Sequence, residues 1–449
     1  MRGADDPREC DADAFDSVPM QRLLVTMLIL AAFAWIRQIE LPGPVPPALA
    51  AVASDNPDWL TIGSLWLTPL IGAFVLVELA ALTVPAWRRL RVGGPVERAR
   101  LTRAALVLGG VMSLIQGSTV VSMMDTFVRA SGQEPGVFLG PSIMLAWFGM
   151  TMLLAYGASI ISRFGLGSGF SMLAGLDTVI RLWMYLETSL SLEMLPQSLA
   201  FLAAAVFAGV LLTSPRYSMD PEQALLSLQL PRPSSSLVPL FLSGSVIIFY
   251  TTLQSAAYPE LPPLEAIGTA TYAAIQGVLT CVGAVVFSKL FNHPKHALPI
   301  LCRAGGVTVE TSAKLAASYG HVLRRTTKQS IIFLVVVIGL ESQEMRIVAL
   351  GGHILTTVVL TTIIIDLVKD YDAFKRRPDL VPVWPIHRLY AVGPALHALR
   401  MEGIDAHARG FSHRSLYAFF APFVPVEIMV PADDAEKARS VLGTLLSPD

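Results

Sequence analysis

The stretch Ile161–Leu182, ISRFGLGSGFSMLAGLDTVIRL, decides the fold of this 449-residue chain. Glycine occupies positions 165, 167 and 169, and the apolar run 142–160 precedes them. Glycine at this density permits positive φ and a tight reversal of the backbone. The stretch therefore predicts two membrane-spanning helices that meet across a very short turn. A phosphate-binding loop is the alternative for a GxGxG run, but that motif follows a strand, and here an apolar helix precedes the glycines.

The composition of the chain favours a membrane protein. Hydrophobic residues make up 53% of the sequence and charged residues only 15%, whereas soluble domains carry roughly a quarter charged residues. The formal net charge of −1 gives no argument for a nucleic-acid partner. The three cysteines (Cys10, Cys281 and Cys302) are far apart and match no metal spacing or disulfide framework. We found no nucleotide-binding motif, so we expect a protein without metal or cofactor that is not an enzyme.

Hydropathy predicts ten membrane spans, because a bilayer core of about 30 Å needs about 20 apolar helical residues. The spans fall near residues 20–40, 60–86, 104–124, 141–162, 169–188, 197–213, 237–256, 266–290, 327–344 and 347–368. Lysine and arginine gather in the loops after the second, eighth and tenth spans, which predicts that both termini are cytoplasmic. The acidic residues 1–19 are unlike a secretory signal, and predict a disordered cytoplasmic tail.

With its surroundings, the glycine stretch resembles the SecY family of protein-conducting channels, with an ungapped match from Gly165 to Arg181. Other family-like segments are IELPGP at 39–44, LTPLIGAFVLVELA at 67–80, RLTRAALVLGGVMSLIQ at 100–116, residues 238–252, residues 310–325 and KDYDAF at 369–374. The resemblance covers roughly residues 20–375. It implies an all-α multi-pass membrane domain of ten helices, in two inverted five-helix halves around a pore.

The resemblance also implies which side chains form the pore and its side opening. The constriction is carried over onto Ile71, Val75, Ala174, Thr178 and Phe249. Bulky apolar side chains seal such a constriction by packing and dewetting, and Ala174 and Thr178 depart from this because they are smaller than the family's isoleucines. The lateral gate is carried over onto Gln116, Ser113 and Thr252. The alternative is that these are ordinary packed helix residues, since Ser and Thr commonly bond their own helix or a neighbouring one.

The long cytoplasmic loop 291–328 is where the family docks its motor and the ribosome. The resemblance places docking on Arg303, Glu310, Lys314, Arg324 and Arg325. Val307 stands where the family has its docking arginine, which argues against a SecA-like motor ATPase or ribosome as partner. The other implied partners are SecE-like and SecG-like subunits, unfolded polypeptide substrates and membrane lipid.

Glu78 and Asp177 are ionisable groups at membrane depth. Such a group costs about 2.5–3.5 kcal/mol at the centre of a span, so each should face the pore or a partner. A proton or ion pathway is the alternative. It would make the chain a secondary transporter of a small solute.

Residues 376–449 predict a cytoplasmic α+β domain, since apolar and polar positions alternate with more charge. We expect strands at 387–391, 404–409 and 425–430, helices at 393–402 and 432–446, and a further segment at 412–421. The pattern resembles small bacterial signal-transducing domains with a ferredoxin-like βαββα layout, which implies a docking or regulatory role.

The leading hypothesis is therefore a SecY-like channel subunit in the cytoplasmic membrane of a bacterium. It would translocate unfolded polypeptides or insert apolar helices, with energy from a partner ATPase. The other hypotheses are the solute transporter and a divergent paralogue kept as a membrane scaffold for its C-terminal module.

Overall fold

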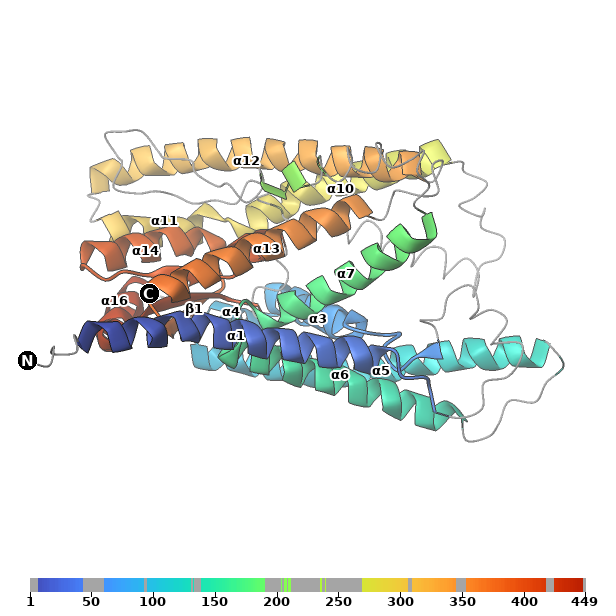
Figure 1. The fold of residues 1–449 in the computed structure, drawn as a ribbon. Coiled ribbons are helices and arrows are strands. Elements are labelled where there is room, and N and C mark those ends of the chain that lie inside the picture. Colours follow the sequence, from blue (N-terminus) through green and yellow to red (C-terminus); the bar gives the residue numbers. More distant parts are fainter. Residues whose placement is uncertain are drawn as a thin grey trace, which may run out of the picture. The chain divides into compact units, whose positions relative to one another are not determined.

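The computed structural model describes residues 7–42, 60–92, 95–130, 132, 139–189, 269–305, 309–344, 353–416 and 424–446, with a few single positions between 203 and 239. The chain divides into two compact units, which are considered separately (Figure 1). The first holds residues 1–176 and 374–378, and the second holds residues 177–373 and 379–449. Phe249, Thr252 and most of the predicted sixth and seventh spans lie outside the described residues.

The first unit is mainly helical in its described part. It contains α1 (Pro7–Arg37), α3 (Thr68–Thr83), α4 (Pro85–Val92), α5 (Pro95–Ala130), α6 (Leu139–Phe164) and the start of α7 (Gly169–Ser189). Helix α5 packs against both α3 and α6, and α1 lies along α6 (Figure 1). Helix α1 begins at Pro7, so it includes part of the predicted acidic tail.

Helix α3 begins later than predicted, because turns occupy the chain before Thr68. An isolated antiparallel bridge joins Glu40 to Thr61, and Trp66 has a positive φ of 41°. At its other end α3 stops at Val84, which is extended because the next residue is Pro85. Helix α4 then leaves at 110° to α3.

In the described part of the chain, four helices are long and apolar enough to cross a membrane. They are Val18–Arg37, Val96–Thr126, Gly140–Phe164 and Ala274–Phe291, and the bent pair α3 and α4 would make a fifth. Residues 169–180 form a shorter apolar helix. These spans match five of the predicted ones and show a membrane protein, but they do not confirm ten.

After the rest of α7, the second unit contains the helices α10 to α13 and ends with a small α+β domain. The helices are α10 (Thr269–Phe291), α11 (Pro294–Gly305), α12 (Val309–Glu344) and α13 (His353–Arg376), and α10 packs beside α12 (Figure 1). The predicted ninth span is the second half of α12, which is one continuous helix of 36 residues.

The C-terminal domain is built on an antiparallel three-stranded sheet in the order β1-β3-β2. Its elements are β1 (Leu380–Ile386), a 3₁₀ turn (Leu389–Ala391), α14 (Val392–Met401), β2 (His407–Arg409), α15 (Phe411–Leu416), β3 (Val426–Pro431), a second 3₁₀ turn (Ala432–Asp434) and α16 (Ala435–Leu446). The predicted first strand at 387–391 is wrong. The real strand precedes it and contains Pro382 and Pro385, which an edge strand tolerates because one side of its backbone needs no ladder partner.

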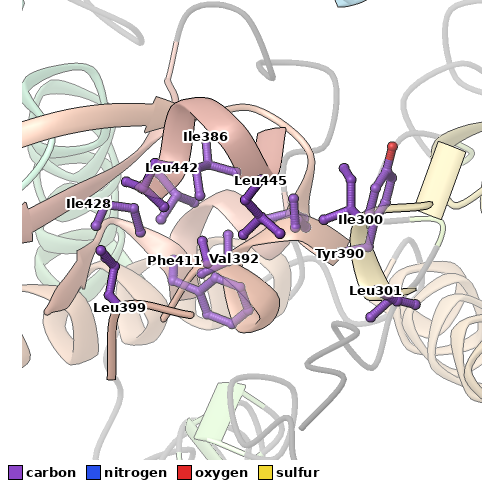
Figure 2. Packing of buried hydrophobic residues seen from close by; sticks show 14 of the residues in the cluster. Ile300, Leu301, Ile386, Tyr390, Val392, Leu399, Phe411, Ile428, Leu442 and Leu445 are labelled. Carbon is purple, nitrogen blue, oxygen red and sulfur yellow. The ribbon is translucent and has the colours of Figure 1, made fainter. Parts of the chain in front are cut away.

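The core of the C-terminal domain continues into the helices before it. Figure 2 shows Ile386, Val392, Leu399, Phe411, Ile428, Leu442 and Leu445 packed together, with Ile300 and Leu301 of α11 beside Tyr390. Leu315, Tyr319 and Leu323 of α12 belong to the same buried cluster. The domain therefore shares its hydrophobic core with α11 and α12 and is not a separately packed module.

Candidate functional site: the glycine turn, α3 and the predicted docking loop

The turn between α6 and α7 has the form that the glycines predict. Helix α6 ends at Phe164, α7 begins at Gly169, and Gly167 takes a φ of +77°. The Gly169 N–H donates to Ser162 Oγ at 2.9 Å. A Cβ on Gly169 would overlap the carbonyl oxygen of Ala158 in α6. The two helices thus approach each other so closely at this position that only glycine fits.

Helix α1 holds this turn in place through a contact that sequence reasoning missed. Thr26 is buried, and its Oγ1 accepts the Leu166 N–H at 2.8 Å. Arg22, one turn earlier, donates from Nη1 to the Gly165 carbonyl oxygen at 3.3 Å. We define Arg22, Thr26, Gly165 and Leu166 as the α1 clasp. The sequence signal for this contact was the polar pair Arg22 and Thr26, which are four residues apart in an otherwise apolar span.

Of the five predicted constriction residues, all but Phe249 lie in the described part of the chain. Ile71 of α3 is 36% exposed, Val75 is half-buried on the same helix, and Ala174 is half-buried on α7. Helices α3 and α7 meet through Phe74 and Phe170, whose ring centroids are 5.4 Å apart. Thr178 is buried but belongs to the second unit. Three of the five therefore lie in the first unit, on two helices that contact each other.

The predicted lateral-gate residues on α5 lie in helix contacts. Ser113 is fully buried and accepts a hydrogen bond from Thr151 Oγ1 of α6 at 3.1 Å. Gln116 faces α3 at Gly72, where an added Cβ would lie 4.0 Å from Gln116 Nε2. Ser113 thus joins α5 to α6, while Gln116 lies against α3.

Glu78 is fully buried in α3 and pairs with Arg91 of α4, with 2.6 Å between Oε1 and Nε. Arg88 of α4 donates to the Leu82 carbonyl oxygen at 3.0 Å, which satisfies the end of α3. The sharp bend after Val84 brings α4 back toward α3 and makes both contacts possible. The expectation that Glu78 meets a partner is confirmed, and its charge is balanced within the chain. Asp177 is half-buried on α7.

The described part of the predicted docking loop is mostly helical, and one face of α11 and α12 packs against the C-terminal domain. Arg303 of α11 donates to the Leu445 carbonyl oxygen at 3.0 Å and so satisfies the end of α16. Lys314, Arg324 and Arg325 are exposed on α12. The side chain of Glu310, and Val307 altogether, lie outside the described residues.

Tyr319 lies on the buried face of α12, away from these exposed basic residues, and contacts the start of the loop. Its hydroxyl donates to the Asn292 carbonyl oxygen at 2.8 Å, and burial raises the pKa of Tyr319 above its ordinary value. The tyrosine therefore stays neutral and keeps the turn between α10 and α11 against α12.

Comparisons with known proteins identify the fold. No protein-family model matches the chain, and no curated protein matches it. Among solved structures, one of the SecY protein, described by how its plug domain stabilises the closed translocation channel, is 15% identical with a TM-score of 0.51. A structure of a protein-conducting channel is 14% identical with a TM-score of 0.50. Each match covers 79% of this chain and 92% of the other. The chain has a SecY-like fold.

Proposed function

We propose that this chain is the channel subunit of a SecY-like protein translocase. It moves unfolded polypeptides across a membrane, or releases apolar helices into it. The observation that carries the proposal is the SecY-like fold over 79% of the chain. The closely packed α6–α7 turn supports it, since that turn lies in the stretch whose residues resemble the family.

The same proposal assigns the finer features that the resemblance implies. The membrane domain is residues 20–375, with ten spans in two inverted halves and a pore between them. The membrane is the cytoplasmic membrane of a bacterium, and both termini are cytoplasmic. SecE-like and SecG-like subunits complete the channel, and a partner ATPase supplies the energy. The half-exposed Ile71 of α3 supports a lining role for that helix.

The C-terminal domain is proposed to be a ferredoxin-like variant. Its βαββα order supports this, with α15 inserted between the second and third strands. The antiparallel order β1-β3-β2 places the last strand in the centre.

Site-specific cross-linking to an arrested polypeptide tests the channel directly. Ile71→Cys and Val75→Cys, in a chain whose own cysteines are replaced, should cross-link to a substrate stalled during transport. Leu145→Cys on α6 is the matched control, because Leu145 is an exposed apolar residue outside the proposed lining. Equal cross-linking at all three positions, or none with any substrate, would contradict the proposal.

A membrane scaffold is the second candidate, favoured by the position of Arg303. This predicted docking residue bonds the C-terminal domain at Leu445, and the apolar face of the loop is buried in the shared core. A scaffold would not need a motor. Purification from membranes with no SecE-like subunit and no ATPase, alongside failure of reconstituted transport, would favour the scaffold over the channel.

A further inference from the structure

Two buried carboxylates near the cytoplasmic end of α13 need partners that the helix itself does not supply. Asp366 is 6% exposed and Asp370 is 1% exposed. They lie four residues apart on one face of α13, where like charges repel. Something outside α13 must therefore compensate both charges.

The first turn of α15 compensates Asp366. The backbone N–H groups of Ser412 and His413 donate to Asp366 Oδ1 and Oδ2 at 2.9 and 2.7 Å. These N–H groups lie at the start of α15, where a helix has no internal acceptors for them. Lys369 Nζ also donates to Ser412 Oγ at 3.1 Å. One turn of α13 thus makes three bonds to one turn of the C-terminal domain.

The sheet compensates Asp370. Asp370 Oδ1 lies 2.7 Å from His407 Nε2, and Oδ2 lies 3.4 Å from Arg409 Nε. Arg409 is itself buried and also pairs with Glu427 of β3 at 3.3 Å. A chain of charged groups therefore runs from α13 through β2 to β3. We define the carboxylate clamp as Asp366, Lys369, Asp370, His407, Arg409, Ser412, His413 and Glu427.

A second, apolar contact anchors the same domain to α11 and α12. Leu301 and Tyr319 are fully buried in the core shown in Figure 2, and Arg303 bonds the end of α16. The domain is thus attached to α13 by charge and to α11 and α12 by apolar packing.

We propose that the C-terminal domain is a conformational brake on α13, which can shift or rotate relative to α11 and α12 only when the carboxylate clamp opens. A rotation or a one-turn shift of α13 would leave two carboxylates buried without their donors, and a buried charge without its partner is strongly destabilising. The proposal depends on contacts within one unit. It holds whether or not the chain conducts polypeptides.

Hydrogen–deuterium exchange on the full chain in lipid nanodiscs tests the brake. In the Asp370→Asn variant, we expect the rate of amide exchange to rise at least tenfold both in residues 407–416 and in the N-terminal half of α13. Asp372→Asn is the matched control, because it removes the same charge from an exposed position on the same helix. Faster exchange in the C-terminal domain with α13 unchanged would overturn the proposal.

A measurement on the unaltered chain keeps the proposal testable if Asp370→Asn fails to fold. Exchange under graded denaturant should show residues 363–372 and α15 opening in one cooperative step with the same denaturant dependence. Opening of α13 while α15 stays protected, or the reverse, would show that the domain is attached to α13 but does not restrain it.

Discussion

The α6–α7 turn is held by backbone atoms, whereas the C-terminal domain is held by buried charge. At the turn, the decisive contact is between Gly169 and the Ala158 backbone, and α1 adds Thr26. At the carboxylate clamp, every contact to α13 uses Asp366, Lys369 or Asp370. A contact between backbone atoms does not change between pH 4 and 8, but a contact through carboxylates and histidines does.

The α6–α7 turn is therefore expected to stay closed, whereas a change of conditions can open the carboxylate clamp. The turn cannot open without separating two packed helices of the first unit. The clamp depends on charged side chains, whereas α11 and α12 contact the domain through apolar packing. Mutations and pH should therefore affect the two regions in different ways.

The largest effect is expected for Gly169→Ala. The new Cβ would meet the Ala158 carbonyl oxygen, and neither backbone can move aside without parting α6 from α7. We expect a loss of roughly 3 kcal/mol or more, seen as a lower thermal midpoint and a lower yield of monodisperse protein in detergent. Gly149→Ala on α6 is the control, since a Cβ there meets no heavy atom within 4 Å. Equal loss in both variants would contradict the close approach.

Acid should weaken the C-terminal domain next most strongly. Burial, reinforced by the charge of Arg414, lowers the pKa of His413 to about 3. The unfolded chain binds this proton below about pH 6.5 and the folded chain does not, so the free energy of unfolding falls as the pH drops from 6.5 toward 3. The contribution of His413 alone to this loss should be about 2 kcal/mol at pH 5, from about 1.4 kcal/mol per pH unit.

The test of the acid effect is a difference between variants. Burial raises the pKa of Glu427, which stabilises the folded domain toward low pH and so opposes the effect of His413. Exchange of residues 424–446, corrected for the intrinsic pH dependence, should lose its acid sensitivity in His413→Gln. The exposed His321→Gln should keep it. Exchange in the α6–α7 turn should not depend on pH in either variant. An acid response of the turn that parallels the response of the C-terminal domain would contradict the contrast between the two regions.

A smaller effect is expected for Thr26→Val in the α1 clasp. The substitution keeps the shape but leaves the buried Leu166 N–H without its acceptor, at a cost of about 1–2 kcal/mol. Thr26→Ser restores the hydroxyl and should recover most of the stability. Thermal unfolding in detergent measures both. Equal midpoints for Val and Ser would mean that the hydroxyl does not hold the turn.

The smallest effect is expected for Arg303→Gln. This partly exposed arginine satisfies one carbonyl at the end of α16, and its loss should cost about 1 kcal/mol or less. Exchange should rise only at the end of α16, while the exposed Arg324→Gln should change nothing there. An effect spread over the whole domain would show that the shared core depends on this single bond.

The turn could be predicted because it depends on one local property, the small size of glycine. Four apolar spans and the α3 segment were found for a similarly local reason, since length and hydropathy are read from consecutive residues. Strand β1 was missed because Pro382 and Pro385 argue against a strand unless its edge position is known. The edge position depends on where β3 pairs, and that pairing lies about fifty residues away.

The clamp was missed because its partners are distant in sequence. Asp366 and Ser412 are 46 residues apart, and Asp370 and His407 are 37 apart. One signal was available: Asp366 follows the apolar run TTIII inside the predicted tenth span, as Glu78 does in the second. The site residues carried over by resemblance were harder to judge, because the same pattern fits a gate or a packing contact. Ser113 makes a packing contact in the structure.

The hydrogen bond from Leu166 to Thr26 joins positions 140 residues apart, and this separation sets an order of assembly. When α1 emerges from the ribosome, the partner of Thr26 has not yet been synthesised. Until then, the hydroxyl can bond the Arg22 carbonyl of its own helix, 3.1 Å away, so the first span can enter the bilayer without a stranded polar group. A nascent chain stalled before residue 166 should therefore hold α1 loosely, and elongation past the glycines should fix it in place.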